Sequence, residues 1–447
     1  MATRKREVTE RAVEGKEPLE GIDQAEAMLQ ELVELLEPTL NPPQEGPGRR
    51  RVLPALCLWA GVLVGVLRGY PSQTQIWRLL CVHGLWSYGR FDVKDGALRK
   101  RLKQGGTEAL RRFFEQITQL LAVRLAPYAE TLAPFAAAVA AIDLTTLDGV
   151  VRKLAILRDV KAGERVLLPG KLAVRFDLRL QQIQKLKHVA DPDQNEKVCA
   201  REMVEGLPRG SLILIDLGYF AFEFFDWLTN QGQFWISRLR EKTSYDIVHV
   251  HYTRGTTLDA LVWLGTHRAD RARHLVRLVQ FRHQGKLFRY ITNVRDPKLL
   301  PLHEIPRLYA RRWDIEMLFK LAKRELKLHL LWSGTLDVVL QQVWAVLTIS
   351  QILQALRKEI AGKAGVDVFD VSMPLMVQML PQFAVRGVDP IAAFVERGRF
   401  GGMIRPSRRN QIQAPRIAPG RLQEPPPDLA MERKPRYAKR KCGSRKN

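Results

Sequence analysis

Residues 309–323 read Tyr-Ala-Arg-Arg-Trp-Asp-Ile-Glu-Met-Leu-Phe-Lys-Leu-Ala-Lys, a stretch of helix-forming residues with neither Gly nor Pro. At about 100° per residue, one face of the predicted helix, roughly 60° wide, carries Tyr309, Arg312, Glu316 and Lys323. Further basic residues lie beside this face: Lys320, Arg324 and Lys327. The apolar residues form a separate stripe that would face a core: Ile315, Leu318, Phe319, Ala322 and Leu326. The helix therefore carries a carboxylate within a basic surface, which suits a metal ion and nucleic-acid phosphates together.

The spacing of the four residues on that face is also a family signature. Tyr, two residues, Arg, three residues, Glu, six residues and Lys is the Y-R-E-K pattern of the DDE transposases of insertion-sequence family four, and residues 309–323 match it without a gap. The surrounding Arg-Trp-x-Ile-Glu-x-Leu-Phe-Lys also resembles that family. The alternative is an ordinary amphipathic helix with a solvated basic face, which four specified residue types at fixed spacing disfavour.

The composition independently favours a polyanionic partner. The chain has 447 residues, enough for two or three domains, and a net charge of +24 from 71 Lys and Arg against 47 Asp and Glu. Such an excess attracts nucleic acid with salt-sensitive affinity. A membrane-surface or ribosome-associated basic protein is the alternative, and charge alone favours nucleic acid only slightly.

The cysteines and the apolar runs argue against several other classes of protein. The four cysteines are scattered without a Cys-x-x-Cys pair, so neither a structural zinc site nor a disulfide framework is predicted, consistent with a reducing compartment. The first twenty residues are heavily charged and do not resemble a secretory signal. The uncharged run 52–67 is short of the roughly 20 residues that span a membrane and contains Pro54, so a buried helix is expected.

The first 130 residues are predicted to be mainly helical. Residues 1–50 are expected to form a partly helical arm, and residues 51–130 a helical domain that binds DNA ends. Within it, a helix over 73–83, a loop, and a basic helix that begins at Asp95 as N-cap could form a helix-turn-helix-like reader. A plain helical bundle with a solvated basic helix is an equally good interpretation, because the loop is long for that motif.

From about residue 131 the pattern changes to α/β. Apolar strand-like runs end in Asp143 and Asp216, and a pair of strands is predicted around Pro169-Gly170 within 166–187. A helix over 220–228 and a strand over 234–237 follow. We assign 131–237 and 299–362 to a catalytic domain, with a long helix over 338–360, and 363–403 to a C-terminal helical region.

Two segments lie outside that domain. Residues 238–298 alternate β-like runs and hold 13 Lys and Arg against 5 Asp and Glu, so a basic β-rich insertion is predicted. The last 47 residues hold 13 Lys and Arg against 3 Asp and Glu together with seven prolines, so residues 404–447 are predicted to be a disordered basic tail.

Three carboxylates could form one reaction centre. Asp143 and Asp216 each end a strand-like run, where functional groups of α/β folds gather, and Glu316 would come from a helix packed on the sheet. Carboxylates that converge repel one another unless a cation lies between them, and hard oxygen ligands favour Mg²⁺ or Mn²⁺. Asp148 competes with Asp143 for the first position, and Asp216 could simply cap the following helix.

The resemblance sharpens this assignment. Asp216-Leu-Gly-Tyr219 with Phe220 resembles the family's D-x-G-Y-F block, and Ile142-Asp143-Leu-Thr-Thr146 resembles its first Asp block, with Leu144 where the family often has Gly. The resemblance implies a ribonuclease-H-like catalytic core with a β-rich insertion behind an α-helical N-terminal domain. It also implies metal-dependent cut-and-paste transposition with Mg²⁺, or Mn²⁺ as substitute.

The resemblance further implies roles and partners. Asp143, Asp216 and Glu316 would hold the metals, and Tyr309, Arg312 and Lys323 would contact phosphates of the element end, with Lys320 and Arg324 beside them. The partners would be double-stranded DNA and a second copy of the chain in a synaptic dimer, in the cytoplasm of a prokaryotic cell. A ribonuclease-H-like nuclease without strand transfer and a non-catalytic DNA-binding derivative are the alternatives.

Two smaller features have more than one interpretation. Trp263 in the insertion could stack a flipped base of a DNA hairpin, as the resemblance implies for an aromatic there, but a core tryptophan is the commoner role. His249 and His251 share a face of a predicted strand, where they could bind a metal or be two exposed polar positions.

Overall fold

The computed structural model describes residues 24–41, 51–146, 170–191, 196–266, 270–328, 331–385, 388–407 and 412–437. The chain forms two compact units, called here the helical unit and the sheet unit. The helical unit comprises Met1–Leu125 with Leu321–Ser407, and the sheet unit comprises Ala126–Lys320 with Arg408–Asn447. The prediction that the catalytic domain extends over 299–362 differs from this division, which assigns the residues after Lys320 to the helical unit.

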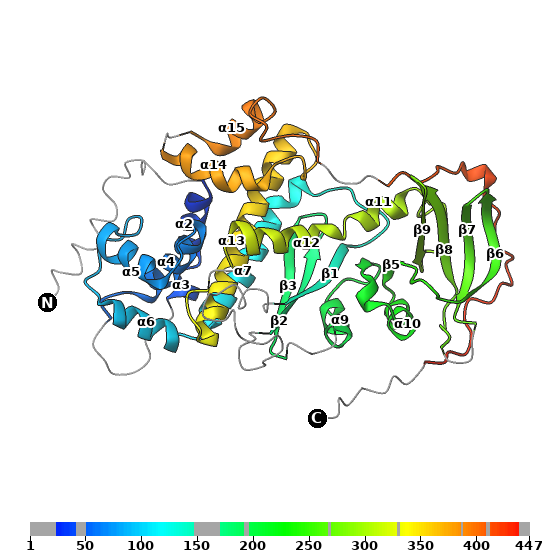
Figure 1. Cartoon of the computed structure of the whole chain (residues 1–447), viewed down its shortest axis with the longest axis horizontal. Helices are drawn as coiled ribbons and strands as arrows, with labels where there is room; N and C mark the ends of the chain where they lie inside the picture. The colour runs from blue at the N-terminus through cyan, green and yellow to red at the C-terminus, as the bar shows by residue number, and fades with distance from the viewer. Residues whose placement is uncertain are drawn as a thin grey trace. The chain divides into compact units, whose positions relative to one another are not determined.

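The helical unit is built around one long apolar helix, α13 (Leu336–Ala364) (Figure 1). Its most apolar window is long enough to cross a membrane but is 83% buried inside the protein, which is typical of a core helix. The other helices of this unit are α2 (Gln24–Leu35), α3 (Glu37–Leu40), α4 (Ala55–Leu67), α5 (Gln73–Arg78), the π-helical η1 (Leu79–His83), α6 (Asp95–Gln104), α7 (Glu108–Leu125), the π-helical η6 (Leu321–Glu325), α14 (Met373–Val385) and α15 (Pro390–Arg397). The predicted buried helix over 52–67 is confirmed as α4, which packs on α13.

The basic helix α6 lies where a second helix of a DNA reader was predicted. Leu98 and Leu102 are buried, whereas Arg99, Lys100 and Lys103 are exposed. Asp95 is the first residue of the helix and pairs with Arg99 at 2.9 Å, and the N-cap is Lys94 rather than Asp95. The exposed basic face is compatible with both interpretations, so the DNA-reading role stays a prediction.

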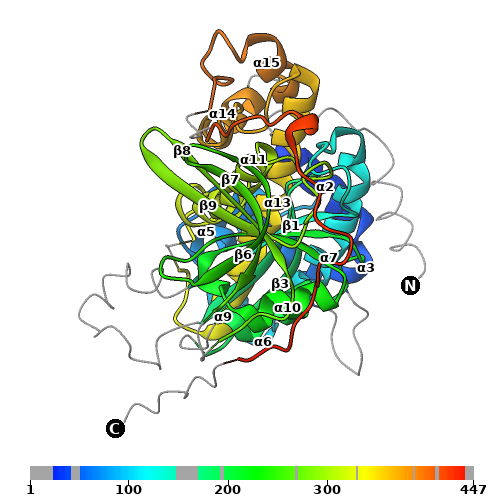
Figure 2. The same ribbon diagram turned by 90° about the vertical axis from the view of Figure 1, so that its right-hand side faces the viewer.

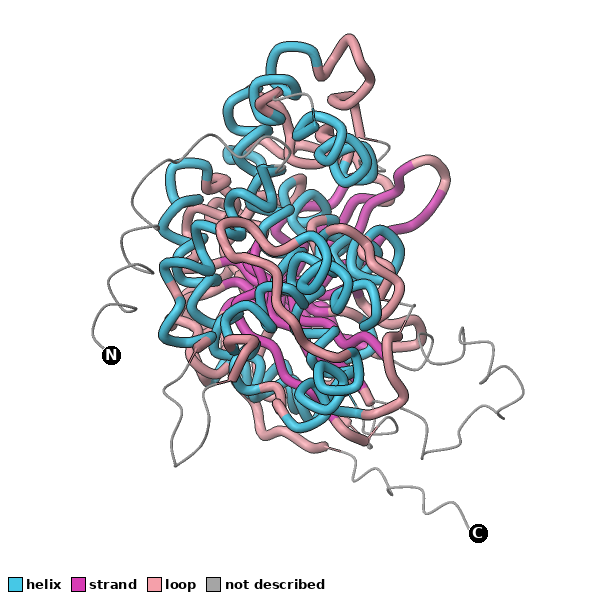
Figure 3. Tube along the Cα trace, turned by 90° about the vertical axis from the view of Figure 1, so that its left-hand side faces the viewer, coloured by secondary structure: helices cyan, strands magenta, loops and turns pink. Residues whose placement is uncertain are grey.

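The sheet unit is built on one nine-stranded sheet with the order β3-β2-β1-β4-β5-β9-β8-β7-β6. Its strands, magenta in Figure 3, are β1 (Val139–Thr146), β2 (Lys171–Asp177), β3 (Gln182–Val189), β4 (Leu212–Ile215), β5 (Phe234–Arg238), β6 (Tyr245–Arg254), β7 (Thr257–Leu264), β8 (Val276–His283) and β9 (Lys286–Thr292). β4 is parallel to both β1 and β5, and every other neighbouring pair is antiparallel. The predicted mixed α/β class is confirmed.

The turn between β2 and β3 lies at residues 178–181. The first strand of the pair predicted around Pro169-Gly170, with Pro169 itself, lies outside the described residues. The carboxylate of Asp177 accepts hydrogen bonds from the backbone N–H groups of Arg179 (2.8 Å) and Leu180 (2.9 Å), so an Asp side chain closes this turn. Gln181 then adopts a φ of +59°, which the Pro-Gly signal gave no reason to expect.

Helices cover both faces of the first five strands (Figures 1 and 2). α9 (Glu196–Val204) and α10 (Phe222–Asn230) lie on one face, and α11 (Glu304–Ala310) and α12 (Trp313–Lys320) lie on the other. Ile142 and Ile215 belong to the core cluster that includes residues of α9 and α10. Because successive side chains of a strand point to opposite faces, the residues that follow them, Asp143 and Asp216, point toward the face that α12 covers.

The segment 309–323 is not one continuous helix. α11 ends at Ala310, Arg311 and Arg312 form a turn, α12 begins at Trp313, and the π-helical η6 follows. The predicted apolar stripe is confirmed as buried: Ile315, Leu318, Phe319, Ala322 and Leu326. The exposed residues of α12 are Trp313, Met317 and Lys320.

The predicted β-rich insertion is present as β6–β9, but it continues the main sheet. β9, which the sequence did not indicate, pairs with β5 and joins the two parts. A buried ion pair links β7 to β8, because Arg277 donates to both carboxylate oxygens of Asp259 at 2.7 and 2.6 Å. Both side chains are fully buried.

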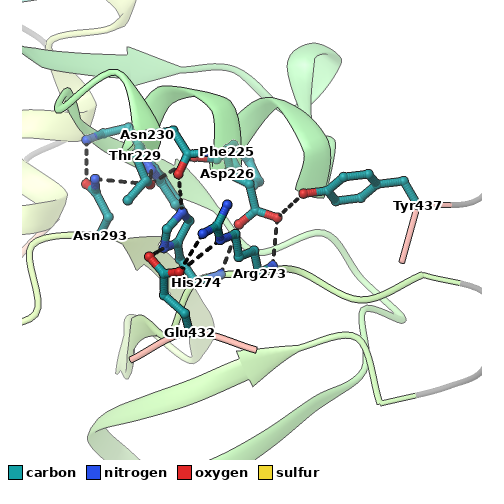
Figure 4. A network of polar contacts seen from close by, with 10 residues as sticks. Phe225, Asp226, Thr229, Asn230, Arg273, His274, Asn293, Glu432 and Tyr437 are labelled. Carbon is teal, nitrogen blue, oxygen red and sulfur yellow. Dashed lines mark hydrogen bonds and ion pairs between the residues drawn. The ribbon is translucent and has the colours of Figure 1, made fainter. Parts of the chain in front are cut away.

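The C-terminal arm, residues 412–437, differs from the predicted disordered tail over 404–447. Its backbone pairs with the segment before β8, where Arg271 and Arg436 exchange two hydrogen bonds. The Tyr437 hydroxyl donates to Asp226 of α10 at 2.7 Å, and Glu432 pairs with Arg273 at 2.8 Å (Figure 4). Composition alone cannot reveal such a segment, because it is held by partners on the sheet and not by a core of its own. Residues 408–411 and 438–447 lie outside the described residues.

Candidate active site

The two aspartates lie on neighbouring parallel strands: Asp143 lies within β1, which continues to Thr146 beyond the predicted end of the run, and Asp216 directly follows the end of β4. β1 pairs with β4 in a register that sets Val139 opposite Leu212 and Ala141 opposite Leu214. The same register, continued past the end of β4, sets Asp143 opposite Asp216. Neighbouring strands lie about 5 Å apart, so the two carboxylates share one edge of the sheet. The alternative first position, Asp148, lies outside the described residues.

Asp216 has one local role already. Its Oδ2 accepts a hydrogen bond from the backbone N–H of Gly218 at 3.3 Å and so caps the short 3-10 helix η5 (Leu217–Tyr219). The other oxygen, Oδ1, lies 3.5 Å from Nε of Arg312. With 38% of its side chain exposed, Asp216 remains accessible while it caps this turn.

Arg312 joins the sheet edge to α12. Its NH2 group donates to Glu316 Oε1 at 2.9 Å, and its Nε faces Asp216. Glu316 lies one helical turn after Arg312, so the pair forms as soon as α12 begins. The structure therefore brings together Asp216, Arg312 and Glu316, which were all predicted as site residues.

Asp143 is partly buried within β1. Burial raises the pKa of its carboxyl to about 7, with Asp216 and Glu316 also raising it, while the Leu144 N–H and the charge of Arg312 lower it. The Leu144 N–H donates to Asp143 Oδ1 at 2.8 Å. A carboxyl group in this environment gains from any added cation, because a positive charge favours its ionised form.

The residues predicted to contact DNA differ in how far they are exposed. Tyr309 is only 6% exposed and packs edge-on against Tyr290, with ring centroids 5.3 Å apart. Burial raises the pKa of its hydroxyl to about 12. Lys320 and Arg324 are exposed, and Lys323 is half-buried in η6, within the helical unit.

A buried network beside the site was not predicted from the sequence. Arg311 donates to Asp314 at 2.7 Å and to both carboxylate oxygens of Glu130, and Asp314 also accepts from Gln181 at 2.9 Å. Asp314 is fully buried and Arg311 is 7% exposed. The network fixes the turn between α11 and α12 to the β2–β3 turn. Arg312 and Glu316, which lie close to Arg311 and Asp314 in the sequence, are thereby held beside Asp216.

One basic residue at this edge was also missed. β4 pairs with β5 so that Ile215 lies opposite Ser237, and the continued register sets Arg238 opposite Asp216. Arg238 is exposed. Arg238 could have been found from the sequence, because it directly follows the predicted strand over 234–237.

The three carboxylates have the chemistry that a hard divalent cation requires, but in this structure they are not arranged to bind one. Three carboxylates supply the oxygen ligands that Mg²⁺ and Mn²⁺ prefer. Within the described part of the chain, however, no three His, Cys, Asp or Glu side chains lie close enough together to hold one ion. The Arg312 guanidinium lies between Asp216 and Glu316, where it balances their charge.

His249 and His251 contact the C-terminal arm, a role that was not predicted from the sequence. Nε2 of His249 and Nδ1 of His251 lie 3.1 and 2.9 Å from the same carbonyl oxygen, that of Gln423 in the C-terminal arm. A carbonyl oxygen accepts hydrogen bonds, so both of these ring nitrogens carry the proton and donate. His251 is buried, which corrects the expectation of two exposed positions.

Trp263 is half-buried and is covered by the C-terminal arm. The guanidinium of Arg433 lies 4.9 Å from the centre of its ring. Arg433 also donates to the carbonyl oxygens of Gly265 (2.8 Å) and Ala272 (3.0 Å). A role in base stacking stays a prediction, and this face of the ring is occupied in the structure.

Comparisons with known proteins find similarity to transposases. Residues 161–352 match the family model of the transposase DDE domain, a range that includes Asp216, Arg312 and Glu316 but begins after Asp143. The transposase InsG for insertion sequence element IS4 of Escherichia coli (strain K12) is 25% identical over 313 residues, 67% of this chain and 69% of that protein.

Solved structures also match the chain. One of them is the cryo-EM structure of the piggyBac transposase synaptic complex with hairpin DNA, which matches with a TM-score of 0.39 and 11% identity over 91% of this chain and 87% of that chain. The family model covers the Y-R-E-K segment and the second aspartate, and together with the IS4 relative it makes the chain similar to the DDE transposases of insertion-sequence family four.

Proposed function

We propose that this transposase binds the inverted-repeat ends of an insertion element, cleaves them by metal-dependent hydrolysis and joins the 3′-hydroxyls to target DNA. The observation that carries the proposal is the register that sets Asp143 opposite Asp216, with Glu316 linked to Asp216 through Arg312. The described groups are those that such chemistry needs at one sheet edge.

We infer that the first five strands form a ribonuclease-H-like core. The order β3-β2-β1-β4-β5, with an antiparallel β1–β2–β3 meander and β4 parallel to β1 and β5, supports this inference. Asp216 follows the carboxyl end of β4, and functional side chains gather at such ends in sheets with parallel strands.

Asp143, Asp216 and Glu316 are the residues proposed to hold Mg²⁺, with Mn²⁺ as a substitute. Bound there, the ions would activate a water or a 3′-hydroxyl and stabilise the leaving oxygen of a phosphodiester. The protein's own part is to present three carboxylates, one from within β1, one from the residue after β4 and one from α12. The raised pKa of Asp143 means that its carboxyl would release a proton as a cation binds.

The proposed DNA surface of the sheet unit follows from its exposed basic residues, Lys320 on α12 and Arg238 at the end of β5. The family signature implies Tyr309 and Arg312 as further contacts in this unit. It also implies Lys323, with Arg324 beside it, in the helical unit. The proposed partners are double-stranded DNA and a second copy of the chain in the synaptic complex, within a prokaryotic cytoplasm.

The test is cleavage of a labelled duplex that carries the repeats flanking the coding sequence, with Mg²⁺. We expect Asp143→Ala, Asp216→Ala and Glu316→Ala each to abolish cleavage while end binding persists. Glu223→Ala is the matched control, because Glu223 is an exposed carboxylate of α10 on the opposite face of the sheet. Normal cleavage by the Glu316 variant would refute the mechanism. Hydrolysis by the wild type without joining would indicate a nuclease instead.

A further inference from the structure

Arg312 is a buried cation whose principal charged partners are two of the proposed metal ligands. The residue is 6% exposed, with NH2 2.9 Å from Glu316 Oε1 and Nε 3.5 Å from Asp216 Oδ1. That Nε is buried without a hydrogen-bond partner among the described residues. The guanidinium is therefore held by charge between the carboxylates, with one donor still available.

A guanidinium in this place opposes a metal ion. It cannot lose its proton, so its charge stays whatever binds beside it. An ion at Asp216 and Glu316 would meet a fixed positive charge at close range, in surroundings that screen it poorly. The carboxylate oxygen that accepts from NH2 of Arg312 is also one that a metal would use.

A DNA phosphate offers Arg312 another partner. The planar fork of a guanidinium matches phosphate oxygens, and such charge-assisted pairs are among the strongest hydrogen bonds in proteins. A phosphate that takes the guanidinium removes the competing cation and leaves two carboxylates with unbalanced charge. Those carboxylates then favour a cation.

We propose that Arg312 is a built-in counter-ion that holds Asp216 and Glu316 in the DNA-free protein and yields them to metal only when DNA phosphate takes its guanidinium. DNA and metal would then each raise the affinity for the other by the same factor, as linkage requires. A free transposase would keep its metal site closed and so would not cleave DNA unproductively. This role rests on the proposed function, because it assumes that the two carboxylates are metal ligands.

The experiment measures Mn²⁺ affinity of the full-length protein from the signal of free Mn²⁺ in electron paramagnetic resonance. Wild type, Arg312→Gln and Arg312→Lys are compared without DNA and with the repeat-bearing duplex. We expect Arg312→Gln to bind Mn²⁺ about tenfold more tightly than wild type without DNA, a typical size for such coupling. DNA should tighten Mn²⁺ binding by wild type and change that of Arg312→Gln far less.

Two controls separate the possible causes. Arg240→Gln removes the same charge from an arginine that contacts the Leu217 carbonyl at 3.1 Å and the Phe220 ring, not the carboxylates, and should leave Mn²⁺ affinity near wild type. Arg312→Lys keeps the charge, so its affinity without DNA should stay close to wild type. Thermal melts of all variants show whether each is folded.

The outcomes distinguish the two proposals. If Glu316→Ala binds Mn²⁺ as the wild type does, with and without DNA, the proposed metal site is wrong. If Glu316→Ala loses Mn²⁺ but folded Arg312→Gln binds it no more tightly than wild type, the site stands and the counter-ion role of Arg312 is refuted. Equal tightening by Arg240→Gln would also refute it, because net charge alone would then explain the effect.

Discussion

Single residues at the turn before α12 decide how the site is held. Arg311 points to Glu130 and Asp314, whereas Arg312, its neighbour, points to Asp216 and Glu316. Two consecutive arginines therefore serve two different carboxylate sets, one that fixes the turn and one at the candidate active site. Arg311 and Arg312 are not interchangeable, although both are buried.

Asp314 is the residue whose loss should cost most at this turn. Asp314→Ala takes from the buried Arg311 one of its two carboxylate partners and from Gln181 one of its two acceptors, so we expect a loss of about 1–3 kcal/mol in the free energy of unfolding. Urea unfolding measures it. Glu304→Ala on α11 is the control, since its pair with Arg307 is partly exposed and should be worth less than about 1 kcal/mol. Equal losses for both would mean that the network does not hold the turn.

His274 should make stability depend on pH. Burial lowers its pKa most; Asp226 and Glu432 raise it, and Arg273 and Arg295 lower it by smaller amounts. Because its folded pKa lies below the unfolded value near 6.5, the folded state binds fewer protons, and stability falls as pH drops through 6.5. We expect His274→Gln to melt below wild type at pH 8 and to lose less stability than wild type between pH 8 and pH 5. Parallel melting curves across that range would contradict this assignment.

Helices and strands could be predicted from the sequence where a continuous apolar run is also buried in the structure. The continuous apolar run before Asp216 forms β4, and the uncharged run before residue 67 forms α4, because both are buried on all sides. The break at Arg311-Arg312 was not predictable, since helix propensity is high there and the cause is a set of partners distant in sequence. Glu316 and Asp216 could be recognised as site residues, but the Arg312 bridge between them depends on tertiary structure.

The elements of the insertion are joined by one buried ion pair. Asp259→Ala on β7 would leave Arg277 of β8 charged and fully buried, so we expect a loss of about 3–5 kcal/mol. Arg277 also donates to the Leu300 carbonyl at 2.6 Å, so the segment that leads to α11 should loosen as well. Replacing the pair by Asp259→Leu with Arg277→Met should recover much of the loss, because both charges are then gone. A double variant less stable than Asp259→Ala would show that hydrogen bonds, and not unpaired charge, set the cost.

For the whole molecule, the C-terminal arm changes what the basic tail is expected to do. Asp226, 2% exposed, accepts from the backbone N–H groups of Arg273 and His274 and from the Tyr437 hydroxyl. The arm thus completes a buried carboxylate site on α10. Arg433, over Trp263, and Glu432, paired with Arg273, are engaged within the sheet unit. The basic residues after Tyr437 are not needed for these contacts, so their contribution to DNA attraction can be tested separately.

Two truncations separate these roles. Ending the chain after Ser407 removes the arm, so the buried Asp226 loses a donor and Trp263 loses its cover. We expect the melting temperature to fall by about 5–10 °C, because a loss of roughly 2–3 kcal/mol has this effect in a unit of this size.

Ending the chain after Tyr437 keeps every described contact of the arm and removes five basic residues: Lys439, Arg440, Lys441, Arg445 and Lys446. That variant should melt like the full chain but bind random duplex less tightly at low salt, with little difference at high salt where screening shortens the attraction. Filter binding at two salt concentrations and thermal melts measure both effects. If truncation after Ser407 left the melting temperature unchanged, the arm would not stabilise the sheet unit, and its contacts with Asp226 and Trp263 would be too weak to matter.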